Sequence, residues 1–332
     1  MPRDGLALPW IVGPGTKYFF GTLTVAAWSA NFHAKDADMI KTKRVLIGLF
    51  AVLTSLPLPL RSQEKLPSPY FIAYSHYLEE PDTLDIEVDA VRGEAHGIDT
   101  FVATATQFEY GVRKWWTSEL YLDTQTTQHQ GSSFTGFRIE NRFRIWEEPR
   151  KVNPVLYVEY ENVTGADRIL KEIVGFDSKA DLAVPISISN REHNHELETR
   201  LILSSDIGQW NLAGNFIGEK DLGPFPWEFG YALGVSRPLA AAAGNRCAFC
   251  AEKFSAGVEL YGGAGTWNKF TLRGTSQYLA PDLLWQVPGE VNLKVSVGWG
   301  LTDESVRMLI RFGVSKDIDG FGRKLGSLFG RH

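Results

Sequence analysis

Ionisable side chains recur at every second position in several stretches of this 332-residue chain. Such spacing places a row of charges on one face of a β-strand, where it could contact a polar solute. Arg138, Arg142 and Arg144 share one such face, and a guanidinium group binds a carboxylate through paired hydrogen bonds, so an anionic solute is expected there first. The complete set of candidate lumen or solute residues is Glu87, Asp89, Glu119, Arg138, Arg142, Arg144, Glu198, Arg200, Arg307 and Arg311. The favoured interpretation is that these charges pair with one another across the interior and leave at most a narrow pathway, and a polar pore or solute site is the alternative.

The motif Cys247-Ala-Phe-Cys250 contains both cysteines of the chain. Its spacing would suit a redox pair or half of a zinc site, but there is no second such motif and no thioredoxin-like pattern around it. In an exported protein the two cysteines are expected to form a local disulfide, with a free or metal-binding pair as the alternative. His193 and His195 are interpreted as an exposed strand end. We expect no metal site and no cofactor.

Two pairs of residues come nearest to a hydrolase dyad: His129 with Ser132, and His96 with Asp99. Neither lies in a nucleophile motif such as G-x-S-x-G, and contacts across strands cannot be read from a sequence. We therefore expect no catalytic residues and no enzyme activity.

The composition narrows the class of protein. Hydrophobic residues make up 44% and charged residues 22% of the chain, and the mean hydropathy is -0.15, which excludes a bundle of membrane helices and a disordered polymer. The formal charge of -5, without a long basic run, argues against a nucleic-acid partner. The 32 glycines and 12% aromatic residues favour β-structure with tight turns.

From residue 83 onward, apolar and polar residues alternate with period two, as in strands that have one apolar face. Leu84, Ile86 and Val88, for example, alternate with acidic residues. An even number of strands of about ten residues predicts an all-β fold, a transmembrane antiparallel up-and-down β-barrel of about 12 strands. The expected strands are 83–92, 98–112, 114–124, 133–146, 153–162, 193–205, 208–218, 227–237, 252–262, 274–287, 291–300 and 304–316.

Periodicity alone does not decide whether the apolar face meets lipid or a protein core, so a secreted soluble β-protein is the alternative. Three observations favour lipid: an export signal, few cysteines, and tryptophans near strand ends, where membrane interfaces lie. These tryptophans are Trp115, Trp116, Trp146, Trp210, Trp227 and Trp299. The expected location is the outer membrane of a Gram-negative envelope.

The export signal lies inside the given sequence and not at its start. Residues 41–62 read KTKRVLIGLFAVLTSLPLPLRS, a basic region followed by an apolar run that prolines interrupt, which predicts a signal peptide over 39–62. We infer that translation begins at Met39 and that 1–38 are a misassigned or non-structural extension, with a genuine extension as the alternative. Residues 63–82 are expected as a periplasmic lead-in, 83–318 as the barrel and 319–332 as an amphipathic tail. The stretch 167–181 has helix-like apolar spacing, and is either a lid over the barrel mouth or a surface excursion.

Over residues 80–318 the chain resembles a family of bacterial outer-membrane barrels named after the MetA pathway of phenol degradation and, more loosely, transporter-type barrels. The resemblance implies an outer-membrane protein of a kind suspected of passing hydrophobic or aromatic compounds and generally without an assigned enzyme activity. The chain departs from the family pattern by continuing beyond Ile318. The stretches that carry the resemblance are 196–203 (ELETRLIL), 210–219 (WNLAGNFIGE), 227–235 (WEFGYALGV), 257–262 (GVELYG) and 309–314 (LIRFGV).

The expected function is porin-like or transporter-like passage of small organic solutes, with hydrophobic or aromatic ones among them. A non-conducting structural or binding barrel is the first alternative, and an outer-membrane hydrolase is the second. The expected partners are outer-membrane lipid, the barrel-assembly machinery and a small-molecule solute, without nucleic acid.

Overall fold

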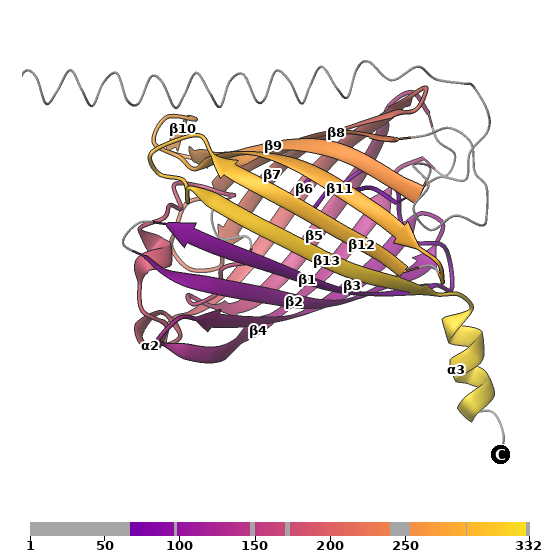
Figure 1. Cartoon of the computed structure of the whole chain (residues 1–332), viewed down its shortest axis with the longest axis horizontal. Coiled ribbons are helices and arrows are strands. Elements are labelled where there is room, and N and C mark those ends of the chain that lie inside the picture. The colour runs from indigo at the N-terminus through magenta and orange to yellow at the C-terminus, as the bar shows by residue number, and fades with distance from the viewer. Residues whose placement is uncertain are drawn as a thin grey trace, which may run out of the picture. The chain divides into compact units, whose positions relative to one another are not determined.

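The alternating segments form strands that close into a barrel, as predicted (Figure 1). The computed structural model describes residues 67–95, 98–146, 150–169, 173–239, 253–289 and 291–329. Every neighbouring pair of strands is antiparallel, and β8 pairs with β9 to complete the ring of twelve. The strands are β1 (Leu84–Ala95), β2 (Ile98–Arg113), β3 (Trp116–Thr127), β4 (Gly131–Arg144), β5 (Asn153–Thr164), β6 (His193–Ile207), β7 (Trp210–Asp221), β8 (Glu228–Pro238), β9 (Phe254–Thr266), β11 (Gln277–Val287), β12 (Val291–Gly300) and β13 (Met308–Ile318), with the two-residue β10 (Lys269–Phe270) paired to β9.

The outer surface of the barrel is aliphatic. Leu120 and Leu122 on β3 are 39% and 38% exposed, whereas Glu119 and Tyr121, which alternate with them, are buried. Exposing such a band of apolar side chains to water is energetically unfavourable, whereas exposing it to the hydrocarbon layer of a membrane is not. Other members of this surface are Val88, Ile139, Leu156, Val158, Leu201, Leu203, Phe216, Leu233, Val295 and Phe312. A closed barrel of this kind is an outer-membrane protein, and the exposed apolar faces, which none of the described residues cover with a second layer, argue against the soluble alternative.

Aromatic side chains gather at both ends of the aliphatic band, as predicted for membrane interfaces. At one end Trp115, Trp116 and Phe143 stack on one another with ring centroids 6.1–6.3 Å apart. At the other end Phe229 packs against Trp267 and Phe270, with centroid distances of 6.2 and 5.8 Å. The two belts mark where the hydrocarbon layer ends on each side.

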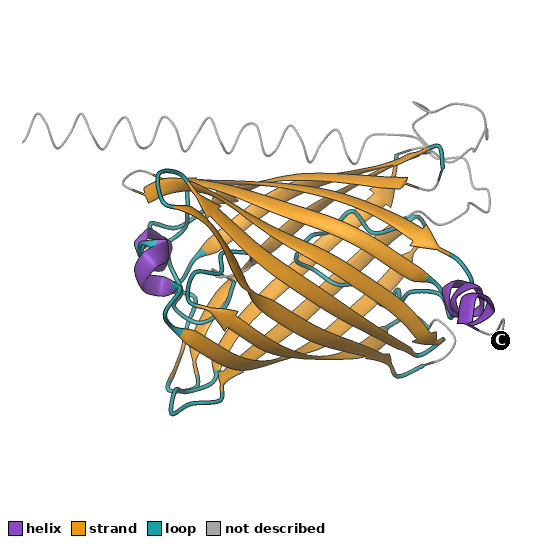
Figure 2. Cartoon of the chain, turned by 90° about the horizontal axis from the view of Figure 1, so that it is seen from below, coloured by secondary structure: helices purple, strands orange, loops and turns teal. Residues whose placement is uncertain are grey.

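The connections differ between the two ends of the barrel. The turns 208–209 and 288–290 are short and lie at the end where β1 begins and β13 finishes, which is the periplasmic end by the usual rule for such barrels. The longest connection, 165–192, joins β5 to β6 at the outer end and contains the 3-10 helix η1 (Asp181–Ala183) and the short helix α2 (Ile186–Ser189). Figure 2 shows helices at opposite ends of the barrel.

Helix α3 (Phe321–Phe329) follows β13 at the periplasmic end. Asp82 holds its start, because its Oδ1 accepts the Gly322 N–H at 2.7 Å and its Oδ2 lies 2.9 Å from Arg323 Nε. The Phe321 N–H also donates to the Asp82 carbonyl at 2.8 Å. None of the described helices is both long and apolar enough to cross a membrane.

Candidate functional site: the barrel lumen

Residues 67–82, here called the luminal segment, run inside the barrel. Glu259 on β9 is fully buried, and its carboxylate accepts the N–H groups of Phe71, Ile72 and Ala73 at 3.0, 2.8 and 2.5 Å. Three converging N–H donors can hold one carboxylate firmly, because hydrogen bonds to a charged group are stronger than neutral ones. We expected these residues as a periplasmic lead-in; the structure instead places them against the lumen wall.

Side chains of β6, β7 and β8 complete the seat of the luminal segment. Asn215 accepts the Tyr74 N–H at 2.7 Å and donates to the Tyr74 carbonyl at 2.8 Å, so its amide acts as a strand partner would. Arg200 Nη1 donates to the Ile72 carbonyl at 3.0 Å. Tyr70 packs over Gly234, where an added Cβ would come within 2.8 Å of its ring. The segment therefore occupies one side of the lumen, along β6 to β9.

The connection 165–192, here called the inward loop, crosses the outer mouth. Val174 and Gly175 pair with Gly230 on β8 and Gly265 on β9 as isolated bridges. This approach needs glycine, because a Cβ on Gly230 would lie 2.2 Å from the Ile173 carbonyl oxygen. The loop is thus a lid that folds into the mouth, and its described residues between 167 and 180 are not helical, contrary to the helix-like spacing of their apolar residues.

The inward loop is also tied to the rim at two separate places. The Ile186 N–H donates to Gln130 Oε1 in the β3–β4 turn at 2.8 Å. The Lys179 N–H donates to the Glu304 carbonyl between β12 and β13, also at 2.8 Å. These contacts hold the lid across the mouth.

Three inward arginines are bound by carboxylates of the protein itself. Arg138 Nε lies 2.7 Å from Asp123, and Arg200 Nε lies 2.5 Å from Glu198. Arg142 contacts three carboxylates, those of Glu109 at 2.5 Å, Glu140 at 2.7 Å and Glu119 at 3.4 Å. Their charges are therefore compensated inside the wall, and Arg138 and Arg142 do not present an open anion site.

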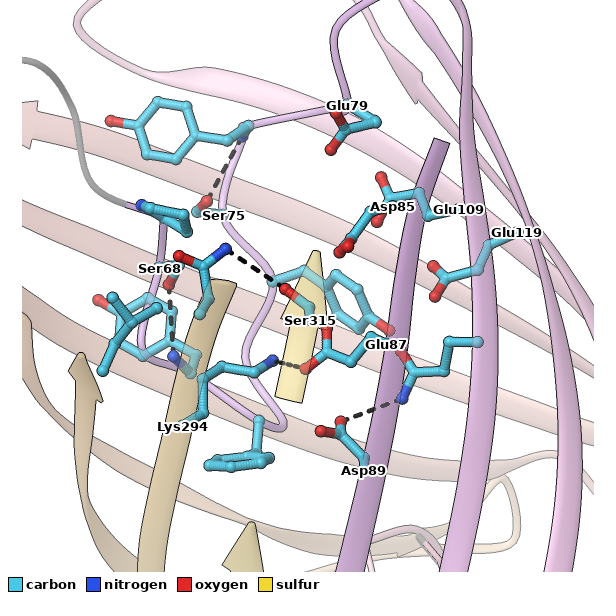
Figure 3. A pocket seen from close by; sticks show the side chains of 18 of the residues that line it. Ser68, Ser75, Glu79, Asp85, Glu87, Asp89, Glu109, Glu119, Lys294 and Ser315 are labelled. Carbon is cyan, nitrogen blue, oxygen red and sulfur yellow. Dashed lines mark hydrogen bonds and ion pairs between the residues drawn. The ribbon is translucent and has the colours of Figure 1, made fainter. Parts of the chain in front are cut away.

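A cavity of about 440 Å³, here called the inner cavity, remains between the luminal segment and the wall formed by β1 to β4 and β11 to β13. Figure 3 shows Glu79, Asp85, Glu109 and Glu119 converging on it. Burial, followed by the negative charges of Glu109, Asp317 and Asp85, raises the pKa of Glu79 to about 8.

Deeper in the inner cavity one acid is paired with a cation and another accepts a hydrogen bond from an amide. Lys294 Nζ lies 2.5 Å from Glu87, and Asp89 accepts a hydrogen bond from Gln107 Nε2 at 3.0 Å (Figure 3). Aromatic rings also line this space, those of Tyr70, Phe71, Tyr74, Tyr77 and Tyr121. The cavity thus combines charged groups with ring faces.

A second space of about 50 Å³, here called the outer cavity, lies beneath the inward loop. Carboxylate oxygens of Glu161, Glu196 and Glu219 all lie within 4.8 Å of one another there. Among the described residues, this group has a spacing that could hold a metal ion, although we expected none. Arg138 and Ile169 line both cavities, so these two side chains separate the inner space from the outer one.

The candidate residues lie in different parts of the barrel. Glu87, Asp89, Glu119, Arg138, Arg142 and Arg311 line the inner cavity, and Glu198 and Arg138 line the outer one. Arg200 holds the luminal segment, and Arg144 lies half-buried at the periplasmic end of β4, donating to the Lys114 carbonyl at 2.8 Å. Arg307 is exposed and lines neither cavity, contrary to expectation, because β13 begins one residue later, at Met308.

Sequence reasoning missed several residues of the lumen. Glu109 on β2 and Glu161 on β5 lie at inward positions of strands in which apolar and polar residues alternate, so the period-two pattern could have identified them. Glu259 and Asn215 carry no sequence signal, because their role depends on the luminal segment reaching β7 and β9 from outside the barrel sequence.

Other predicted features have different outcomes. Cys247, Cys250 and the predicted signal peptide 39–62 lie outside the described residues. His129 and Ser132 are both exposed at the β3–β4 turn, and Ser132 Oγ shares a hydrogen bond with Thr126 Oγ1 at 2.8 Å. This pair therefore has no enclosed surroundings that would favour hydrolase chemistry.

No protein-family model matches the chain, and no curated protein matches it. Among solved structures, it is similar to the COG4313 outer membrane channel from Pseudomonas putida F1, with 11% identity, 73% of this chain and 98% of that chain covered, and a TM-score of 0.44. It is also similar to the KdgM porin, with 8% identity, coverage of 70% and 98%, and a TM-score of 0.40. The outer membrane phospholipase A from Escherichia coli has 10% identity, coverage of 78% and 96%, and a TM-score of 0.37. These likenesses are general ones between barrels, and the predicted MetA-pathway family is not established by them.

Proposed function

We propose that this outer-membrane barrel is a porin-like channel for small organic solutes. The observation that carries the proposal is the pair of luminal cavities that share Arg138 and Ile169 as a common boundary. Together they outline a route from the periplasmic side of the lumen to the space beneath the inward loop. The route is narrow, since the outer cavity holds about 50 Å³ against about 440 Å³ for the inner one.

The lining of the inner cavity favours polar solutes. A purely hydrocarbon solute would contact the acidic and basic side chains of this lining without hydrogen-bonding to them. Such contact is unfavourable because the charged groups would lose water and gain no polar partner. The ring faces of Tyr70, Phe71 and Tyr121 nevertheless allow the solute to carry an aromatic group. The proposed solutes therefore include the aromatic compounds that the family resemblance implies, provided that they also carry a polar group. Contact with outer-membrane lipid and insertion by the barrel-assembly machinery belong to the same proposal.

A non-conducting barrel is the competing function, because the luminal segment and the inward loop both occupy the lumen. Conductance in planar bilayers and swelling of liposomes in a small neutral solute separate the two. The channel predicts measurable conductance, and conductance rises in Ile169→Ala because the boundary between the cavities widens. Ile188→Ala is the matched control, since Ile188 on α2 is 53% exposed. Absence of conductance in the natural chain and in Ile169→Ala would favour the non-conducting barrel.

A further inference from the structure

A row of carboxylates runs across neighbouring strands of the lumen wall. Asp317 on β13 pairs in register with Asp85 on β1, and Asp85 pairs with Glu109 on β2. Glu109 then pairs with Glu119 on β3, which pairs with Glu140 on β4. Side chains at paired positions of adjacent strands point to the same face, and here that face is the lumen.

The row continues without interruption over the next strands. Glu140 pairs with Glu159 on β5, and Glu159 with Glu198 on β6. Glu198 pairs with Glu219 on β7, which pairs with Glu228 on β8. Nine consecutive strands thus contribute one carboxylate each, and we name this row the carboxylate ladder. Like charges directly opposite one another destabilise a sheet, so fold stability alone does not explain the ladder.

The carboxylate ladder rises from one end of the barrel to the other. Strands of a barrel are tilted, so a row that follows the pairing direction climbs along the barrel axis. Asp85 is the second residue of β1 at the periplasmic end, whereas Glu228 is the first residue of β8 at the outer end. In between, the ladder touches both cavities, through Glu119 in the inner one and Glu219 in the outer one.

The charges around the ladder are unequal. Arg138, Arg142 and Arg200 compensate its middle, but the cavities at either end carry an excess of acid. Eight acidic and four basic residues line the inner cavity, and six acidic residues accompany one basic residue, Arg138, in the outer cavity. Such a lining concentrates cations and repels anions.

Two further observations point to a positively charged ligand. Asp85, a member of the ladder, lines the inner cavity, and its buried Oδ1 has no hydrogen-bond partner among the described residues, so this cavity retains capacity for a donor or cation. The rings that line the inner cavity already lie against cations, with the Arg138 guanidinium 4.1 Å from the Tyr121 centroid and Lys294 Nζ 5.0 Å from that of Phe71. Carboxylates combined with ring faces suit an ammonium or guanidinium group.

We propose that the carboxylate ladder makes the channel selective for cations, and that its organic solutes carry an amine or guanidinium group. This inference rests on the proposed channel function and names its solute class. It replaces the anionic solute expected from Arg138, Arg142 and Arg144.

The test is the reversal potential of the full-length protein in planar bilayers under a tenfold KCl gradient, repeated with ethanolammonium chloride. Ideal selectivity for a monovalent ion gives about 59 mV under such a gradient. We expect a potential of the cation-selective sign with both salts. For each removed charge, Asp85→Asn combined with Glu219→Gln should lower the cation permeability about fourfold and raise the anion permeability about fourfold, the change expected for unit charges about 5 Å apart in a watery medium. The cation-to-anion permeability ratio should therefore fall by about sixteenfold per charge.

The matched control is Glu94→Gln combined with Asp303→Asn, which removes two charges from exposed positions and should leave the permeability ratio unchanged. Heat-modifiable gel migration shows that each variant is folded. An anion-selective or unselective channel overturns the cation proposal and leaves the channel function standing. A cation-selective channel whose ratio is the same in the Asp85/Glu219 variant also overturns it. Absence of any conductance refutes the channel function itself.

Discussion

Replacing Glu259 by alanine should release the luminal segment from the barrel wall. The buried carboxylate holds three backbone N–H groups, those of Phe71, Ile72 and Ala73, at 2.5–3.0 Å. Hydrogen bonds to a charged group contribute about 1.5–3 kcal/mol each, so three of them stabilise the seated segment by at least about 4 kcal/mol. Since about 1.4 kcal/mol corresponds to a factor of ten, the open population of the segment should rise about a thousandfold.

Hydrogen exchange measures this effect directly. In the natural protein the amides of Ile72 and Ala73 should exchange slowly, and in Glu259→Ala they should exchange about a thousandfold faster if opening limits the rate. Glu259→Gln retains one acceptor oxygen and should give an intermediate rate. The amide of Leu120, in the middle of β3, serves as an internal reference that should not change.

Conductance gives a second readout of the same change, because a loosened luminal segment should enlarge the path beside the inner cavity. Asp303→Ala, an exposed carboxylate at the outer end, is the control for loss of charge alone. Unchanged exchange at Ile72 and Ala73 in a folded Glu259→Ala barrel would show that Glu259 does not anchor the segment, and the reasoning from its three hydrogen bonds would fail.

Three other predictions concern the inward loop, the ion pairs and pH. Gly230→Ala should push the inward loop outward and raise conductance, because the new Cβ would lie 2.2 Å from a carbonyl oxygen of that loop, whereas Gly214→Ala, with no neighbour closer than 3.6 Å, should have no effect. Arg142→Met leaves three carboxylates without their cation and should destabilise the barrel by about 3–5 kcal/mol. The variant should therefore lose heat-modifiable migration at a lower midpoint temperature than the natural protein, and the difference should be smaller in acid, where carboxylates are protonated. Equal midpoint temperatures for the variant and the natural protein would contradict this prediction. Because the pKa of Glu79 is about 8, this group gains its negative charge as pH rises through that value, so the cation preference should increase between about pH 7 and about pH 9 and the increase should be absent in Glu79→Gln.

Local periodicity was sufficient to predict the barrel wall. Whether a residue such as Leu120 or Glu119 faces lipid or lumen depends only on its parity along the strand, so the alternation identifies both the strands and their two faces. The prediction of twelve strands is confirmed, with ends that differ from the expected ones by a few residues. The same parity rule predicts that Glu87, Arg138 and Arg311 face the lumen, and these three residues line the inner cavity. Arg307 precedes its strand and lines neither cavity.

Contacts between residues far apart in the sequence were decided only by the tertiary structure. The luminal segment shows no period, and its seat on Glu259 joins residues separated by more than 180 positions, so no local pattern could reveal it. The pairing register likewise determines which carboxylates line up, because a shift of one residue would turn a side chain such as Glu159 to the lipid face. The sequence by itself determined a membrane barrel with a charged interior; the closure and register of its strands decided that Arg138 and Arg142 are compensated and that nine carboxylates form one continuous row.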